Sequence, residues 1–137
     1  MPREPEPPTS IASYHAHLYW SSAAEREQAL AVRERIAERF VVQLGRIHDR
    51  NVGPHTQPMY QVAFTPDVFS ALVPWLMLNR GELSVLIHPN TGRERDDHLL
   101  HAAWLGPRLA LNADTLSNSP EESGISPVVP NTSPRPS

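Results

Sequence analysis

Apolar and polar residues alternate along residues 11–20, and this alternation predicts a β-strand. The even-numbered positions from Tyr14 to Trp20 are apolar, whereas His15 and His17 occupy odd-numbered positions between them. Because successive side chains of a strand point to opposite faces of the sheet, one face of this strand should be apolar. The other face should carry imidazoles.

Two helices are predicted from apolar stripes at helical spacing. Ser22 and Glu25 form a capping-box pair at the start of the first helix, residues 23–40. The second helix should begin with Pro66 at its first position and end near Asn79, and Pro74 inside it should kink or shorten it. The predicted buried stripes are Ala29, Val32, Ile36 and Phe40 in the first helix, and Phe69, Leu72, Val73 and Leu76 in the second.

Three more strands and a short helix complete the pattern. The strands are predicted at residues 41–47, 59–64 and 83–88, with Pro89 ending the last of them, and the short helix at residues 96–104. The order β-α-β-β-α-β indicates an α+β ferredoxin-like sandwich, with two helices on one face of an antiparallel sheet. In such a sheet we expect the first strand to lie between the third, parallel to it, and the fourth, antiparallel to it.

The length and the proline distribution predict one folded domain between two tails. A chain of 137 residues can bury one core of ordinary size. Prolines crowd into both ends, so we expect disorder in residues 1–10 and 117–137, and a folded domain over residues 11–116.

Composition narrows the classes of partner and cofactor. The net charge is -3 and the basic residues are dispersed, which argues against nucleic acid. No apolar run approaches the roughly 20 residues of a membrane helix, and the first ten residues lack a signal-peptide core, so a cytoplasmic location is expected. Cysteine is absent, so a bound metal would have to be held by histidine and oxygen ligands.

Histidines are the residues most indicative of chemistry. With the strand order expected above, His15, His17, His55 and His88 converge on one end of the sheet. Neutral imidazole is a preferred ligand of iron, zinc and copper. Taken singly, His15 or His17 also fits a solvated sheet face, and His88 fits a turn cap. Glu82, Asp49, Asp96 and Asp97 are available as carboxylate ligands, but spacing selects none of them. We assign no site role to His48 or His101. Tyr19 shares the face of the strand that carries the histidines and could line a pocket.

Several motifs occur in one order and at fitting intervals between about Ser13 and Leu116. Together they resemble the DOPA 4,5-dioxygenase family. The motifs are Tyr14-His15-Ala16-His17-Leu18-Tyr19, Val52-Gly53-Pro54-His55, the segment from Leu83 to Gly92 that contains Ile87-His88-Pro89-Asn90, and Asp97-His98 followed by Trp104-Leu105-Gly106.

The resemblance implies a ferredoxin-like fold and an iron(II)-dependent extradiol cleavage, in which O2 opens the ring of DOPA or a related catechol to a semialdehyde. We predict His17, His55 and His88 as the metal ligands, with zinc as a substitute for iron in the isolated protein. His15 or His98 is the predicted acid–base group, because the pKa of histidine lies near neutrality. The choice between His15 and His17 as ligand stays open.

Two further expectations concern recognition. Arg46 or Arg80 could pair with the carboxylate of an amino-acid substrate. The alternative function is a non-catalytic metal-binding or dimeric ligand-binding module of the same fold. A homodimer would form through the open face of the sheet, with Leu86, Met59 or Tyr19 as contacts.

Overall fold

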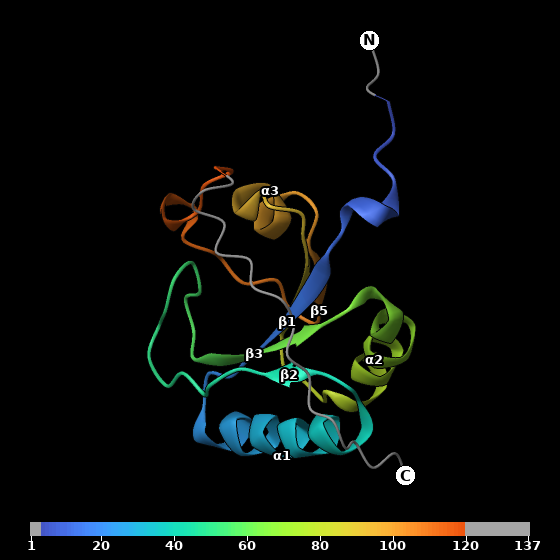
Figure 1. The fold of residues 1–137 in the computed structure, drawn as a ribbon. Helices are drawn as coiled ribbons and strands as arrows, with labels where there is room; N and C mark the ends of the chain where they lie inside the picture. The colour runs from blue at the N-terminus through green and yellow to red at the C-terminus, as the bar shows by residue number, and fades with distance from the viewer. Residues whose placement is uncertain (1–3, 120–137) are drawn as a thin grey trace.

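The computed structural model describes residues 4–119 and contains one five-stranded antiparallel sheet in the order β2-β3-β1-β4-β5. Figure 1 shows α1 and α2 on one side of this sheet and α3 on the other. The predicted ferredoxin-like α+β architecture is confirmed. The elements are η1 (Pro8–Ser10), β1 (Ser13–Tyr19), α1 (Ala23–Arg39), β2 (Gln43–Leu44), β3 (Met59–Phe64), α2 (Pro66–Asn79), β4 (Val85–Asn90), α3 (Glu94–Leu99), β5 (Ala103–Leu105) and η2 (Ala113–Thr115). Most of the predicted C-terminal tail lies outside the described residues, as do residues 1–3 of the predicted N-terminal tail.

The main core lies between the sheet and the two long helices. The apolar positions of β1 pack there against the helical stripes, as the period-two and helical patterns predict. Helix α1 starts where expected, because the Ser22 hydroxyl accepts a hydrogen bond from the Glu25 N–H at 3.1 Å. Helix α2 runs through Pro74 to Asn79, so that proline does not shorten it.

A second, smaller core covers the opposite face of the sheet. Tyr19, Met59 and Leu86 are buried there under side chains from the 48–58 loop and from the segment that follows α3: Val52, Ala102, Trp104, Leu109 and Leu111. These three residues were the predicted dimer contacts. That prediction is wrong, because the chain itself already covers them.

The relative direction of β1 and β3 also differs from the prediction. The two strands are antiparallel, with Tyr14 opposite Phe64 and Tyr19 opposite Met59. The reason is topological: the α1 crossover returns β2 in the direction of β1, and β3 pairs antiparallel with β2. The start of β3 therefore lies beside the end of β1, and His55 approaches the histidines across the face of the sheet.

Several element boundaries were predicted wrongly around the edges of the sheet. The second strand spans only Gln43–Leu44, and the chain returns to the ladder in a single bridge between His48 and Met59. Strand β4 continues through Pro89, which lies beyond the three residues that pair with β5, so the missing N–H disturbs no pairing there. The predicted 96–104 helix is instead α3 (Glu94–Leu99) followed by the edge strand β5.

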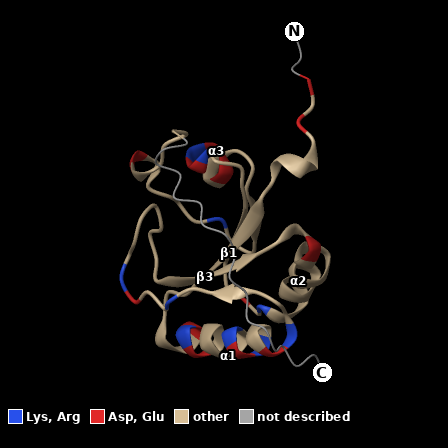
Figure 2. Cartoon of the chain, in the orientation of Figure 1, with Lys and Arg blue, Asp and Glu red and all other residues tan. Residues whose placement is uncertain are grey.

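Charged side chains lie outside the central strands. Figure 2 shows them along α1 and around α3, whereas β1 and β3 carry none. Within residues 4–119, no helix combines the length and the apolar character that crossing a membrane requires.

Candidate metal centre

Five of the seven histidines gather on the sheet face opposite the long helices. His15 and His17 project from β1, and His88 projects from the neighbouring strand β4. His55 comes from the loop before β3, and His98 comes from α3. Their rings form one continuous set of contacts, with centroid separations from 3.9 Å for His88 and His98 to 6.2 Å for His17 and His98.

His17 lies at the centre of this imidazole cluster. Its ring centroid is 4.2 Å from that of His55 and 5.2 Å from that of His88. The Nε2 atoms of His17 and His88 are 3.1 Å apart, at hydrogen-bond distance. His17 is 2% exposed, so these contacts replace its contacts with water.

Two groups of three imidazoles within residues 4–119 could hold one metal ion. In each group, one nitrogen from each ring lies within 4.8 Å of the others: the first group is His15, His17 and His88, and the second is His17, His55 and His98. The predicted ligands His17, His55 and His88 therefore draw on both groups. His17 belongs to each.

Three of the rings are held by hydrogen bonds to Nδ1. The carbonyl of Pro89 lies 3.0 Å from Nδ1 of His88, and the carbonyl of Glu94 lies 2.7 Å from Nδ1 of His98. Because a carbonyl only accepts, both Nδ1 atoms must carry the proton, and in the neutral rings Nε2 is left with a lone pair. Nδ1 of His55 lies 2.7 Å from the Tyr19 hydroxyl, so its Nε2 also remains for other partners.

Burial keeps the cluster uncharged near neutral pH. Burial first, and the neighbouring histidines after it, lower the pKa of His15 to about 4 and that of His55 to about 3. The pKa values of His17 and His88 fall well below the ordinary value for the same reasons. Burial also lowers the pKa of His98, against an opposing effect of its hydrogen bond to the Glu94 carbonyl and of the Asp97 charge.

A cavity of about 370 Å³ opens onto the cluster. Five histidines of the described chain line it, four from the cluster together with His48, and Glu94 is the carboxylate in its wall. The lining residues are His15, His17, His48, Val52, Gly53, Pro54, His55, Met59, Gln61, Glu94, His98, Thr115 and Leu116. The cavity has the volume typical of small-molecule sites.

Comparisons with known proteins identify the family. The chain matches the Dopa 4,5-dioxygenase family over residues 14–115, which include all five clustered histidines. The chain belongs to this family. It is 34% identical over 128 residues to a DOPA 4,5-dioxygenase of Amanita muscaria, covering 88% of this chain and 55% of that protein.

Two other relatives in the comparisons are an uncharacterised protein and a solved structure. An uncharacterised 21.2 kDa protein of Botryotinia fuckeliana is 38% identical over 112 residues, covering 73% of this chain and 61% of that protein. The crystal structure of a proposed dioxygenase from Nostoc punctiforme superposes with a TM-score of 0.79 at 50% identity, covering 81% of this chain and 96% of that one. The chain thus spans between 55% and 61% of the lengths of these two curated relatives.

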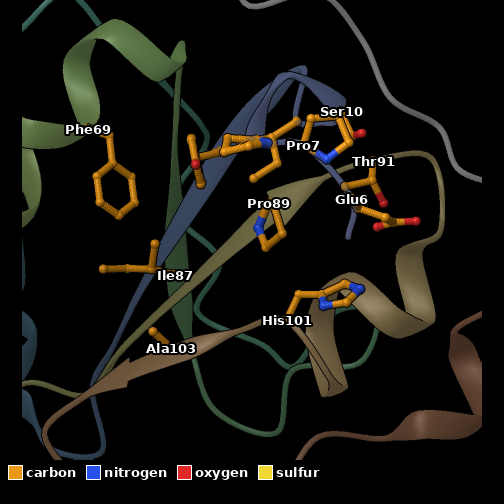
Figure 3. A pocket seen from close by; sticks show the side chains of 12 residues that line it. Glu6, Pro7, Ser10, Phe69, Ile87, Pro89, Thr91, His101 and Ala103 are labelled. Carbon is orange, nitrogen blue, oxygen red and sulfur yellow. The ribbon is translucent and has the colours of Figure 1, made fainter. Parts of the chain in front are cut away.

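Three residues considered in the sequence analysis lie outside the cavity beside the imidazole cluster: Arg46, Arg80 and His101. The guanidinium of Arg80 donates to the carbonyls of Met77 and Leu83, and neither Arg80 nor Arg46 lines the cavity. His101 lies in a separate, mostly apolar hollow of about 560 Å³ on the helix side of β4 (Figure 3), where it is the single histidine.

Sequence reasoning missed two residues of the cavity wall. Glu94 was not among the carboxylates considered, although its position four residues before His98 is the spacing at which helical residues meet. His48 was given no site role, but its bridge to Met59 brings it to the rim.

The donor set fits a transition metal ion. Imidazole nitrogens are suitable ligands for iron(II) and zinc, and several here have lone pairs fixed by hydrogen bonds on the far side of the ring. Nδ1 of His17 is buried and has no hydrogen-bond partner among the described residues. A bound metal ion would supply a partner for this lone pair.

Proposed function

We propose that this protein is a non-haem iron(II)-dependent extradiol dioxygenase that opens the ring of DOPA or a related catechol with O2 to give a semialdehyde. The observation that carries the proposal is the group of His17, His55 and His98 on the wall of a cavity large enough for a catechol. The activity named for the Amanita muscaria relative supports the same reaction.

His17 and His55 would hold the metal, as the sequence predicts. The third ligand is either His88, as predicted, or His98, which lines the cavity together with the first two. Three protein ligands leave part of a six-coordinate shell free for reactants, which suits a reaction of two molecules. Iron(II) held there would supply the one-electron chemistry that lets O2 react with a catechol.

His15 is the proposed acid–base group. Its ring lies half-buried on the cavity wall, 5.8 Å from the ring of His17, so it can meet a catechol without blocking the ligands. As a neutral imidazole it can accept the proton that a catechol hydroxyl loses and return it to the opened product. Val52, Met59 and Leu116 supply the apolar wall against which an aromatic ring would lie.

The test is anaerobic reconstitution with iron(II), addition of L-DOPA, and admission of air while absorbance and oxygen uptake are followed. Ring cleavage should give a yellow product with one O2 consumed per product. His17→Ala should abolish turnover, whereas His101→Ala, a histidine change in the other hollow, should retain it. Full turnover in His17→Ala would overturn the proposed site.

The alternative module makes a different prediction in the same assay. A closed zinc site with no turnover of any catechol would favour a non-catalytic metal-binding protein of this fold. The homodimer and the cytoplasmic location stay predictions. Light scattering and cell fractionation test them.

A further inference from the structure

We propose that His88 is a positioning residue for His17 and not a metal ligand: it fixes the His17 ring so that Nδ1 is the atom offered to the metal. This inference rests on the proposed function, since it assigns roles within the proposed metal centre. It changes the predicted ligand set from His17, His55 and His88 to His17, His55 and His98.

The chain of hydrogen bonds begins at a backbone carbonyl. The Pro89 oxygen accepts from Nδ1 of His88, so Nε2 of the neutral His88 ring has a lone pair and can only accept. Nε2 of His17 lies 3.1 Å away, and it must therefore be the donor. A neutral imidazole carries one N–H, which leaves Nδ1 of His17 as a bare lone pair.

Within residues 4–119, Nδ1 of His17 is the one fully buried histidine nitrogen that lacks a hydrogen-bond partner. Nδ1 of His17 is buried and makes no hydrogen bond to any described residue, while the Nδ1 atoms of the three other buried rings are all engaged. A buried acceptor without a partner costs free energy unless something else occupies it. With Nε2 committed to His88, Nδ1 is the remaining ligand atom of His17.

Access to the cavity distinguishes His88 from the three proposed ligands. His88 is 1% exposed and does not line the cavity, whereas His17, His55 and His98 all do. A metal that must be reached by substrate and O2 belongs on the cavity side of His17. His88 contacts His17 without lining the cavity, so it can supply the hydrogen-bonded shell that supports metal-binding histidines in many proteins.

Zinc(II) titration of the metal-free protein and of three variants tests this assignment. His17→Gln should abolish binding. His88→Leu should keep one site but weaken it by about 10- to 100-fold, the usual effect of losing such support. His88→Gln should recover much of the loss, because its amide oxygen can accept the His17 N–H. Equal loss of the site in His88→Gln, His88→Leu and His17→Gln would make His88 a ligand and overturn the proposal.

A second measurement needs no metal. Ring ¹⁵N chemical shifts of the metal-free protein should report His17 as the Nε2–H tautomer, and His88→Gln should preserve that tautomer. Observation of the Nδ1–H tautomer in the wild-type protein would overturn the inference on its own. If the wild-type protein binds neither iron(II) nor zinc(II), the proposed function fails, while the tautomer still decides whether His88 orients His17.

Discussion

The carboxylate of Asp97 accepts two hydrogen bonds from Thr91, one from the backbone N–H at 2.8 Å and one from the hydroxyl at 2.7 Å. Asp97 is 1% exposed, so the interaction is shielded from water. It joins the residue that follows β4 to the middle of α3 and thereby places His98, the next residue, beside His88. The position of one histidine of the cluster thus depends on a residue that does not line the cavity.

Asp97→Asn should therefore weaken both the fold and the metal site. An amide can accept on one atom only, so one Thr91 bond is lost, at a cost of about 1–3 kcal/mol in unfolding free energy. Zinc affinity should fall as His98 loses its fixed position. Urea unfolding and zinc titration measure the two effects. Asp49→Asn, which breaks an exposed ion pair with Arg26, is the control and should leave zinc affinity unchanged.

Tyr19 and Tyr60 offer a matched pair of buried hydroxyls. Each makes one hydrogen bond of 2.7 Å, Tyr19 to His55 Nδ1 and Tyr60 to the Ala29 carbonyl. Both Tyr→Phe changes should cost about 1 kcal/mol of unfolding free energy. Only Tyr19→Phe should weaken zinc binding, by about 10-fold or more, because only Tyr19 holds a proposed ligand. Equal zinc affinities in the two variants would show that Tyr19 does not orient His55.

The metal-free protein should lose stability in mild acid. Burial lowers the pKa of folded His15 to about 4 and of folded His55 to about 3, from an ordinary value of 6.5. Below pH 6.5 the unfolded chain binds more protons than the folded one. The unfolding free energy therefore decreases as the pH is lowered, until the pH reaches the pKa of the folded state. Each such histidine contributes a slope of about 1.4 kcal/mol per pH unit.

Urea unfolding at steps between about pH 7.5 and pH 4.5 measures this slope. The stabilisation from neutral histidines should be fully present above the ordinary histidine pKa and should decline below it. His15→Gln removes one titrating group and should flatten the profile. Parallel profiles for the wild-type protein and His15→Gln would contradict the assigned burial effect.

Glu94→Gln tests whether a carboxylate joins the metal centre. Glu94 lines the cavity, and burial together with the charge of Asp97 raises its pKa. If three imidazoles are sufficient, the variant should bind zinc with the same stoichiometry and within a few-fold of the wild-type affinity. A large loss would instead indicate two histidines and one carboxylate, the other common arrangement for non-haem iron.

The sequence was most informative where structure is local. Alternation along β1 correctly predicted which face carries His15 and His17, because strand geometry alone sets that pattern. The direction of β3 relative to β1 depends on how three strands connect, and there the prediction failed. His55 still reaches the cluster because its loop crosses the sheet face and its ring is held by Tyr19.

The third ligand could not be chosen from the sequence for a physical reason. His88 and His98 are both buried histidines of family motifs, and what distinguishes them is their access to the cavity. The carbonyls that fix their rings belong to Pro89 and Glu94. Any residue type can supply a backbone carbonyl, so the sequence does not reveal these hydrogen bonds. Strand β5 was missed because three residues are too few to show a period.

The pairing register of β1 decides whether a recombinant molecule can bind metal. Its alternate side chains build the main core on one face and the imidazole cluster on the other. A shift of one residue in its pairing would exchange the two sets, burying imidazoles under α1 and α2 and turning apolar side chains towards the cavity. Metal content per chain should therefore measure the fraction of molecules folded in the correct register, independently of any catalytic assay.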